Sequence, residues 1–288
     1  MSELPRVPRR ASWAEIKRAL ESSGFRPSRA LGQNFLVDEN MLRAIARDSG
    51  VGPEDFVLEV GPGCGVLTAH LLDAGAHVLA VELDPRLHDF ARHFLAGSDV
   101  EWLLGDALAG KHALAPALVA ALPRDRDWHL VSNLPYSAGT PILVACSRLD
   151  RPPVTATVLV QADLAERITA EPGGREWGAL SARLQAVYVV RRLRTLPPGL
   201  FWPRPQVDSA LVRLDRRERW PTRDELDELD RLVACLFEQR RKTVRNRLEQ
   251  HYGSRERADD ACRQLEIDPR ARPENLGLKD LLALAARR

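Results

Sequence analysis

A glycine-rich segment between a predicted strand and a predicted helix constrains the fold of this 288-residue chain more than any other feature. Residues 59–65 read Glu-Val-Gly-Pro-Gly-Cys-Gly and follow an apolar run of strand type. Glycines at such a turn let the backbone bend sharply and approach a ligand, because no Cβ atom stands in the way. The spacing GxGxG differs from the GxGxxG that packs a helix beside a pyrophosphate. The segment therefore predicts a strand–turn–helix unit that contacts a ligand without needing phosphate groups.

Short apolar runs of strand type alternate with helical patterns from residue 56 onward. Strands are predicted over residues 56–60, 77–83, 100–104, 128–132 and 155–160. Helical spacing follows the first two runs, over residues 65–72 and 85–95, and Pro85 suits the first turn of the second helix. This alternation predicts an α/β domain with a mostly parallel, doubly wound sheet.

The pattern becomes helical from residue 222 onward and holds no strand candidate. Phe237, Val244 and Leu248 fall at helical spacing on one face, which predicts one helix through this stretch. We therefore place a small all-α domain over residues 217–288, after the α/β domain over residues 26–216.

Residues 1–25 are basic and fit neither domain. Pro5, Pro8 and the pair Arg9-Arg10 predict a partly disordered arm, although residues 13–20 have a helical pattern. The N-terminus lacks the apolar stretch of a signal peptide, and no apolar run is long enough to cross a membrane. We expect a cytoplasmic protein that contacts no membrane.

The spacing of the four cysteines does not predict a metal site. Cys64, Cys146, Cys235 and Cys262 form no CxxC pair, and no His/Cys cluster has the spacing of a zinc site. We expect a reduced protein without a metal. Cys64 lies in the glycine segment with no His or Lys close in sequence to activate it, so we interpret it as a small packing residue.

Basic residues are segregated along the chain, although the formal net charge is only +2. Lys and Arg outnumber Asp and Glu by seven to three over residues 1–30, eight to three over 186–219, and seven to two over 239–257. Such blocks are typical of nucleic-acid binders, whose cations contact phosphates. Solvated arginine-rich faces give the same pattern, so charge alone leaves both interpretations open.

Two acidic residues follow the glycine segment at the ends of successive predicted strands. Glu82 lies 21 residues beyond Gly61, where an acid can accept hydrogen bonds from ribose hydroxyls. Asp106 comes just after the third strand, where a carboxylate could bind an adenine amino group. Each acid alone is typical of a capping or solvated residue, but together with the glycines they favour a nucleoside cofactor.

The fourth predicted strand leads into Asn133-Leu134-Pro135-Tyr136, which looks like the (Asn/Asp)-Pro-Pro-(Tyr/Phe) motif of amino-methyltransferases. An amine conjugated with its ring is a poor nucleophile. The Asn133 side-chain oxygen and the Leu134 carbonyl could accept its two N–H groups and expose the lone pair. Pro135 would stiffen the turn, and Tyr136 offers a face for base stacking. A plain strand followed by a Pro-Tyr turn would have the same residues.

Further motifs occur with these in a fixed order. They are Gly-Gln-Asn-Phe-Leu at 32–36, Phe-x-Pro-x-Pro-x-Val-Asp-Ser at 201–209, and Gln-Arg-Arg-Lys-Thr-Val-Arg-Asn at 239–246. With all of them the chain resembles the small-subunit ribosomal RNA adenine dimethyltransferases, the kasugamycin-sensitivity enzymes, from about residue 26 to 286. The resemblance implies a Rossmann-like class I methyltransferase domain and a helical domain that binds the ribosome.

The resemblance also implies the reaction and its partners. Family members transfer methyl groups from S-adenosylmethionine, which becomes S-adenosylhomocysteine. The acceptors are N6 atoms of two adjacent adenosines in a hairpin loop near the 3′ end of 16S rRNA, each of which becomes N6,N6-dimethyladenosine. The partner would be the small ribosomal subunit, and we expect a monomer.

Family pattern assigns the site residues. The cofactor-binding set is Asn34, Leu36, Gly61, Gly63, Glu82, Asp106 and Asn133. The catalytic set is Asn133, Leu134, Pro135, Tyr136 and Phe201, with Phe201 stacked on a flipped adenine opposite Tyr136. The RNA-binding set, expected on one helix, is Arg240, Arg241, Lys242, Arg245 and Arg247. Ser137-Ala138-Gly139 departs from the family pattern, and Gly139 is expected to loosen the turn.

Three alternatives remain from the sequence. An erythromycin-resistance type of enzyme, which methylates large-subunit rRNA, shares the Gln-Asn-Phe segment, but Leu134 and residues 239–246 argue against it. A non-catalytic ribosome assembly factor could keep the fold, but the intact motif at 133–136 argues for activity. A NAD-dependent oxidoreductase is disfavoured by the GxGxG spacing and by the lack of a substrate domain.

Overall fold

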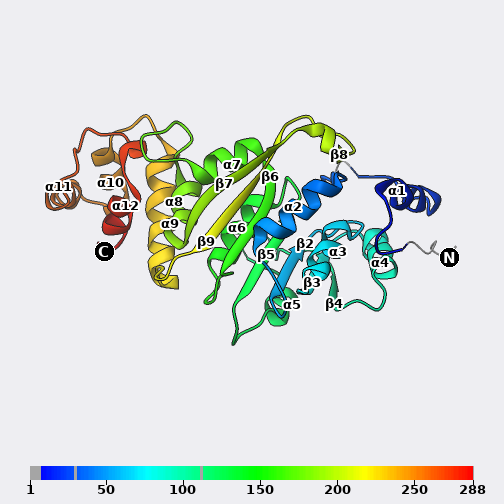
Figure 1. The fold of residues 1–288 in the computed structure, drawn as a ribbon. Coiled ribbons are helices and arrows are strands. Elements are labelled where there is room, and N and C mark those ends of the chain that lie inside the picture. The colour runs from blue at the N-terminus through cyan, green and yellow to red at the C-terminus, as the bar shows by residue number, and fades with distance from the viewer. Residues whose placement is uncertain (1–7, 29–30, 111–112, 288) are drawn as a thin grey trace. The chain divides into compact units, whose positions relative to one another are not determined.

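The structure, a computed structural model, describes residues 8–28, 31–110 and 113–287. These residues form two compact units, whose helices and strands are labelled in Figure 1. The first unit holds the described residues up to 146 together with 153–162 and 191–215. The second holds 147–152, 163–190 and the described residues from 216 onward.

A seven-stranded sheet, most of it in the first unit, has the strand order β4-β3-β2-β5-β6-β9-β7. Neighbouring strands from β4 to β6 are parallel, whereas β9 is antiparallel to β6. Its strands are β2 (Phe56–Val60), β3 (His77–Glu82), β4 (Val100–Leu104), β5 (Trp128–Asn133), β6 (Thr155–Gln161), β7 (Tyr188–Leu196) and β9 (Ser209–Arg216). The predicted mostly parallel, doubly wound sheet is confirmed.

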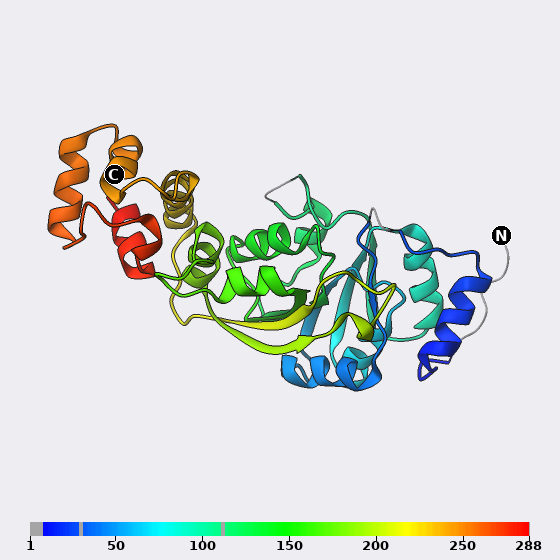
Figure 2. The same cartoon turned by 90° about the horizontal axis from the view of Figure 1, so that it is seen from above.

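Helices connect the parallel strands and cover the sheet (Figure 2). They are α2 (Glu39–Ser49), α3 (Val66–Asp73), α4 (Pro85–Phe94), α5 (Pro116–Ala121) and α6 (Gly139–Ser147). All five residues of β2 are buried, as expected for a strand with both faces covered. Asp84 caps α4 through the Arg86 amide, and Pro85 stands at its first position.

Strands β7 and β9 were not predicted, because arginines interrupt their apolar patterns. In the structure two of these arginines bond to the C-terminal end of α2. Arg213 donates to the carbonyls of Asp48 and Ser49 at 2.7 and 2.8 Å, and Arg194 pairs with the Asp48 carboxylate at 2.7 Å. A cation at a helix C-terminus satisfies carbonyls that have no partner within the helix. Part of the charge of the basic block 186–219 is therefore neutralised or hydrogen-bonded within the fold.

A short second sheet and an N-terminal helix complete the first unit. Strand β1 (Phe35–Leu36) pairs antiparallel with β8 (Phe201–Trp202), which follows the 3-10 turn η1 (Pro198–Leu200). Helix α1 (Trp13–Ser22) begins at a capping box between Ser12 and Glu15. The helical pattern predicted over residues 13–20 is confirmed, and the buried apolar face of α1 shows that this part packs on the fold. The arm predicted for residues 1–25 otherwise stays a prediction, and residues 1–7 lie outside the described residues.

The second unit is mainly helical. It contains most of α7 (Ala162–Thr169) and all of α8 (Ala179–Val187), α9 (Arg223–Glu238), α10 (Val244–Tyr252), α11 (Arg255–Gln264), the 3-10 turn η2 (Pro273–Asn275) and α12 (Leu278–Ala285). The Trp177 indole N–H donates to the Leu276 carbonyl at 3.0 Å, which ties the segment before α8 to that before α12. The compact unit thus includes 163–190, while the domain boundary at residue 217 stays a prediction.

The single helix predicted through Phe237 and Leu248 is wrong. Helix α9 ends at Glu238 and α10 begins at Val244, with residues 239–243 forming a turn between them. The Thr243 hydroxyl accepts a bond from the Asn246 amide at 3.4 Å and caps α10. An N-cap threonine favours a new helix start over continuation of the old one, and that signal was present in the sequence.

Candidate functional site

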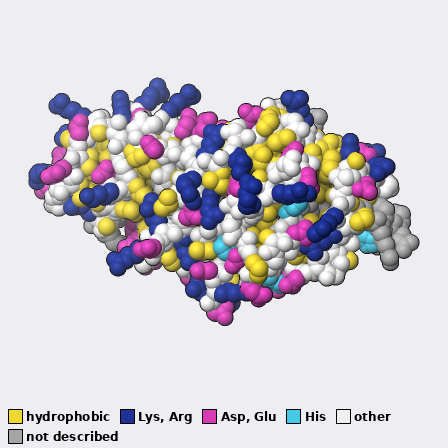
Figure 3. Space-filling view, in the orientation of Figure 1, with side chains coloured by type: hydrophobic (Ala, Val, Ile, Leu, Met, Phe, Trp, Pro, Cys, Tyr) yellow, Lys and Arg dark blue, Asp and Glu magenta, His cyan; other side chains and the backbone are white. Residues whose placement is uncertain are grey.

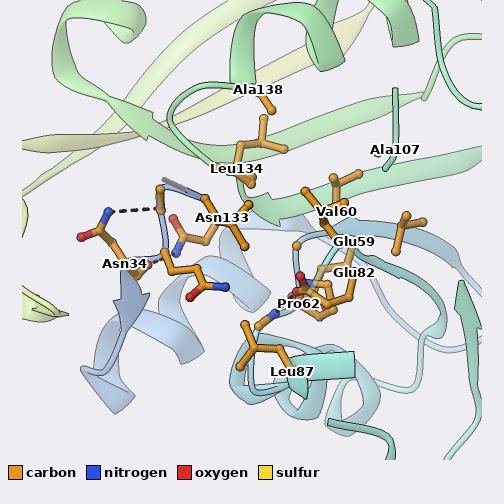
Figure 4. Close-up of a pocket in the computed structure, with 18 of the residues that line it drawn as sticks. Asn34, Glu59, Val60, Pro62, Glu82, Leu87, Ala107, Asn133, Leu134 and Ala138 are labelled. Carbon is orange, nitrogen blue, oxygen red and sulfur yellow. Dashed lines mark hydrogen bonds between the residues drawn. The ribbon is translucent and has the colours of Figure 1, made fainter. Parts of the chain in front are cut away.

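A cavity of 380 Å³ opens at the carboxyl ends of the parallel strands in the first unit. The turn after β2 and the turn after β5 both line it, and these strands are neighbours at which the strand order reverses. Such a switch point is where open α/β sheets bind ligands. The Ser132 hydroxyl donates to the Val60 carbonyl at 2.6 Å and joins the ends of the two strands. Figure 4 shows residues from both turns facing the same cavity.

The glycine turn is shaped by two close neighbours. A Cβ atom at Gly63 would lie 2.8 Å from Cε1 of Phe35, and one at Gly61 would lie 3.3 Å from Cγ of Pro135. Both glycines also have positive φ, at 73° for Gly61 and 60° for Gly63. Only glycine combines this conformation with so close an approach. The turn thus packs against β1 on one side and against the Asn133–Tyr136 motif on the other.

Glu82 lies at this cavity with its carboxylate held by the backbone. Its Oε2 accepts from the Gly63 amide at 3.0 Å, and its Oε1 accepts from the Asp84 amide at 2.9 Å. Burial raises the pKa of this carboxyl, and the two amide bonds act against that rise. A carboxylate oxygen has two acceptor positions, so Glu82 keeps capacity for ribose hydroxyls.

Glu59 also lines the cavity, and the sequence analysis gave it no role. It is buried near the carboxyl end of β2, where the Thr68 hydroxyl donates to its Oε2 at 2.6 Å. Burial raises its pKa to about 8, and the nearby Glu82 adds to the rise. An acid within an otherwise apolar buried strand was the signal that could have identified it. Figure 4 shows Glu59 and Glu82 close together beside Pro62.

The Asn133 side chain has one defined orientation. Its Nδ2 donates to the Asn34 backbone carbonyl at 3.0 Å. Because a carbonyl only accepts, the amide NH₂ must face Asn34, and the Oδ1 atom is left to accept other donors. The N-terminal segment therefore sets which atom Asn133 can offer to a substrate.

The three residues after Asn133 are held by separate contacts. The Leu134 amide donates to the Leu159 carbonyl at 3.1 Å, and the Pro135 carbonyl accepts from Ala138 and Gly139. The Tyr136 hydroxyl lies 2.9 Å from that of Ser209, which fixes its ring at the cavity wall. Gly139 is the first residue of α6, and its effect on the turn stays a prediction.

The structure brings the predicted cofactor residues to one cavity. Asn34, Leu36, Gly61, Gly63, Glu82, Asp106 and Asn133 all line it. Asp106 is exposed, and its Oδ1 accepts from the Leu108 amide at 2.9 Å, so the second carboxylate oxygen stays accessible. Gln33, also missed from the sequence, donates to Asp84 at 3.0 Å and ties the N-terminal segment to the end of β3.

Phe201 does not lie where the sequence analysis expected. Its side chain is 5% exposed and belongs to the hydrophobic core with Leu36 and Val57. It is absent from the cavity wall that Tyr136 lines. Pairing of β8 with β1 turns Phe201 inward, so the predicted stacking opposite Tyr136 is corrected to a core role in this structure.

The predicted RNA-binding residues divide into two groups. Arg240, Arg241 and Lys242 lie in the turn between α9 and α10, not on a helix. Arg247 is 2% exposed, donates to the Cys235 carbonyl and pairs with Glu238 at 2.7 Å, so its RNA-binding role is corrected to a structural one. Arg245 pairs with Asp259 at 2.7 Å. Figure 3 shows Lys and Arg side chains along the upper edge of the C-terminal helices.

The cysteine interpretation is confirmed at Cys64. Its side chain is fully buried, and burial raises the pKa of its thiol to about 12. Among the residues that the structure describes, no group of His, Cys, Asp and Glu could hold a metal ion. In the same part of the chain, no helix is long and apolar enough to cross a bilayer.

The chain is similar to a family model and to curated proteins that all carry ribosomal RNA methylation in their names. A model of the family described as ribosomal RNA adenine dimethylase matches residues 24–286. The ribosomal RNA small subunit methyltransferase A of Thermobifida fusca is 40% identical over 276 residues, which are 96% of this chain and 95% of the relative. The protein of the same name from Mycobacterium avium is 40% identical over 95% of this chain and 86% of its own length.

Solved structures show the same fold. The 23S rRNA methyltransferase ErmE aligns with a TM-score of 0.67 and 27% identity, covering 88% of this chain and 98% of its own. A dimethyladenosine transferase from Plasmodium falciparum aligns with a TM-score of 0.70 and 22% identity, covering 86% of this chain and 94% of its own.

Proposed function

Because this chain belongs to the ribosomal RNA adenine dimethylase family, we propose that it dimethylates N6 of two adjacent adenosines in a hairpin loop near the 3′ end of 16S rRNA. Its relatives at 40% identity are named as small-subunit enzymes, whereas the 23S rRNA methyltransferase ErmE is 27% identical. The substrate is the small ribosomal subunit, and the reaction belongs to subunit biogenesis in the cytoplasm. The chain acts as a monomer that needs neither a metal nor a membrane.

The residues at the cavity fit S-adenosylmethionine. Gly61 and Gly63 form a cradle that side chains would fill, and 380 Å³ is within the usual range for a small-molecule site. Glu82 and Asp106 offer acceptors for ribose hydroxyls and for an adenine amino group. Glu59 offers a carboxylate to a cation. When bound, this cofactor supplies a methyl carbon activated by its sulfonium sulfur, and S-adenosylhomocysteine is left.

The Asn133–Tyr136 motif prepares the adenine amine. Asn133 Oδ1 and the Leu134 carbonyl accept the two N–H groups, which directs the nitrogen lone pair toward the methyl carbon. The new N–C bond would form as the bond between the methyl carbon and the sulfonium sulfur breaks, and the cationic nitrogen would then lose one proton to solvent. Until that proton leaves, the same two oxygens would stabilise the N–H groups. Tyr136 supports the base by stacking, and its hydroxyl is held by Ser209. Positioning accounts for most of the acceleration, and no strong general base is required.

The residues that bind RNA are those whose cationic side chains are accessible to solvent. Arg240, Arg241 and Lys242 form a turn in the second unit, and Arg241 and Lys242 are exposed. Arg245 is half-buried in its ion pair and makes a smaller contribution. These residues contact phosphates of the small subunit, whose loop adenosines are unpaired and enter the cavity at little cost.

The observation that carries the proposal is the Asn133 side chain at the cavity wall, whose NH₂ group donates to the Asn34 carbonyl and whose Oδ1 is left to accept. The test is incubation with small subunits from an unmethylated strain and labelled cofactor, followed by mapping of the modified positions. We expect label on two adjacent adenosines near the 3′ end of 16S rRNA, and none with the Asn133→Ala variant. Label on large-subunit rRNA would support the erythromycin-resistance type instead. Absence of label with intact subunit binding would indicate a non-catalytic assembly factor.

A further inference from the structure

Helix α1 has a position in the first unit that its sequence did not reveal. Ile16, Ala19 and Leu20 on its buried face share a hydrophobic cluster with Phe90 and Phe94 of α4. The cluster also contains Cys64 of the glycine turn. The family match begins at residue 24, so α1 precedes the matched region. The helix packs beside the cofactor cavity without supplying any of its lining residues.

An aromatic group connects α1 to that cavity. The Trp13 ring lies 6.4 Å from the ring of Phe35 and 5.7 Å from that of Trp202. Phe35 stacks on Trp202 at 5.9 Å, and Phe25 meets the edge of Phe35 at 6.1 Å. The Lys17 ammonium, one turn along α1, lies 5.2 Å from the Trp202 ring centre. Phe35 is therefore enclosed by three aromatic rings, one of which comes from α1.

Phe35 is also the residue that approaches Gly63. The space above Gly63 is so small that a Cβ atom there would overlap the Phe35 ring. The Gly63 amide in turn donates to Oε2 of Glu82. A displacement of the Phe35 ring would therefore free the Gly63 peptide to move and would lengthen this bond.

The second oxygen of Glu82 is connected to α1 by another route. Its donor is the Asp84 amide, and the Asp84 carboxylate is held by Arg86 at 2.9 Å. The Arg86 guanidinium lies 5.1 Å from the ring centre of Phe25. The Phe25 amide donates to the Leu20 carbonyl of α1 at 3.1 Å. Both amides that hold Glu82 thus have neighbours that pack on α1.

We propose that α1 positions the cofactor site, with Trp13 holding Phe35 against Gly63 so that Glu82 keeps its place for the cofactor ribose. This inference rests on the proposed function, because it assumes that the cavity binds S-adenosylmethionine. Trp13 is a positioning residue, since it touches neither cofactor nor substrate. Loss of its ring weakens cofactor binding and leaves the adenine-orienting residues Asn133 and Leu134 unchanged.

The test is calorimetric titration of the full chain with S-adenosylhomocysteine in the absence of RNA. Trp13→Ala should raise the dissociation constant about fivefold, the size expected for loss of an aromatic contact, while kcat at saturating cofactor stays unchanged. Trp13→Phe should restore binding. Arg18→Ala, on the exposed face of the same helix, is the matched control and should bind like the wild type.

A double-mutant cycle shows whether Trp13 acts through Glu82. In a Glu82→Gln background, Trp13→Ala should add no further loss of affinity, because the group that it positions is already altered. An equal fivefold loss in both backgrounds would overturn the inference, and so would an unchanged constant for Trp13→Ala alone. Thermal unfolding checks that each variant is folded; if Trp13→Ala is not, Trp13→Leu takes its place with the same expected results.

Failure of the wild-type chain to bind the ligand would overturn the proposed function together with this inference, whereas the other outcomes affect this inference alone.

Discussion

At the scale of single residues, the site depends on how two side chains are held by their surroundings. Asn133 is oriented by a backbone carbonyl, so its acceptor atom is determined before any substrate arrives. Glu59 is held protonated near neutral pH by burial, and a cationic ligand would favour its charged form. Both effects give measurable consequences.

Asn133→Ala removes an acceptor that acts on the amine during transfer. We expect kcat to fall by about 100-fold or more, the size seen when one positioned transition-state partner is lost. The cofactor dissociation constant should stay within about tenfold, because one neutral hydrogen bond contributes about 1 kcal/mol. Single-turnover methylation and cofactor titration measure the two values. Asn133→Asp keeps an acceptor but sets an oxygen against the Asn34 carbonyl, so it should not restore the wild-type rate; wild-type turnover in either variant would refute the assigned role.

Glu59→Gln should change how stability depends on pH. The pKa of Glu59 is raised from 4.5 to about 8 in the folded chain, so the folded state binds the proton more tightly than the unfolded state. The contribution of this group to stability is therefore fully present below pH 4.5 and declines as pH rises toward 8. Compared with the wild type, the variant should gain thermal stability at pH 8.5 relative to pH 5. An identical pH dependence of the melting temperature in the two proteins would contradict this assignment.

The same shift predicts a pH effect on ligand binding. Because the cofactor is cationic, it should bind better when Glu59 is charged, so its affinity should increase as pH rises toward 8. This increase should be smaller in Glu59→Gln. Calorimetry in two buffers of different ionisation enthalpy would detect the released proton, and equal proton release in both proteins would exclude Glu59 as its source.

At the scale of secondary-structure elements, short turns determine where functional groups point. The glycine turn between β2 and α3 brings the backbone against Phe35 and Pro135, and the turn between α9 and α10 presents three cations. The second turn is fixed by Arg247, whose guanidinium bonds to the Cys235 carbonyl near the end of α9. Arg247 thus supports the basic turn from within the unit.

Arg247→Ala should destabilise the second unit without directly removing an RNA contact. We expect a loss of about 2–3 kcal/mol in the free energy of unfolding, because the charged Arg247 donor is removed and the Cys235 carbonyl loses its bond to that donor. Urea denaturation measures this loss. The salt dependence of subunit binding by the folded variant should match that of the wild type, and a shallower dependence would mean that Arg247 reaches RNA.

At the scale of the whole molecule, the distribution of charged residues matters more for RNA binding than the net charge of the chain. The block at 186–219 is partly occupied by internal ion pairs, with Arg191 and Arg213 paired to Asp215 and Arg194 paired to Asp48. In contrast, Arg241 and Lys242 are exposed in the second unit. Basic blocks of similar size therefore predict unequal contributions to RNA binding.

Neutralising Arg240, Arg241 and Lys242 to Gln should weaken binding to the small subunit and reduce its salt dependence. Loss of three phosphate contacts should lower the slope of log affinity against log salt by about 2. The matched control neutralises Arg231, Arg255 and Arg263, which carry the same charge in the same unit but lie in ion pairs with Glu228, Glu249 and Asp260. Filter binding across a salt series compares them, and equal slopes for the two triple variants would refute the assignment.

The sequence by itself determined the parallel part of the central sheet and most of the cavity wall. Periodicity located β2 to β6 because their signals are local, and the glycine turn, Glu82, Asp106 and the Asn133–Tyr136 motif follow these strands directly. Carboxyl ends of parallel strands meet at one edge, so local order along the chain became proximity in space. The family resemblance added the substrate, which no pattern of apolar residues encodes.

Only the tertiary structure decided which of these side chains are free to act. Phe201 and Arg247 were both expected to act on RNA, yet the Phe201 ring lies in the core and the Arg247 guanidinium is bonded to a neighbouring helix end. Glu59 was assigned to a predicted strand and given no role, but complete burial gives it a raised pKa. The helical pattern of α1 was visible in the sequence, but its contacts with Phe35 and α4 were not. Burial and hydrogen-bond partners come from residues far apart in sequence, so a local pattern does not specify them.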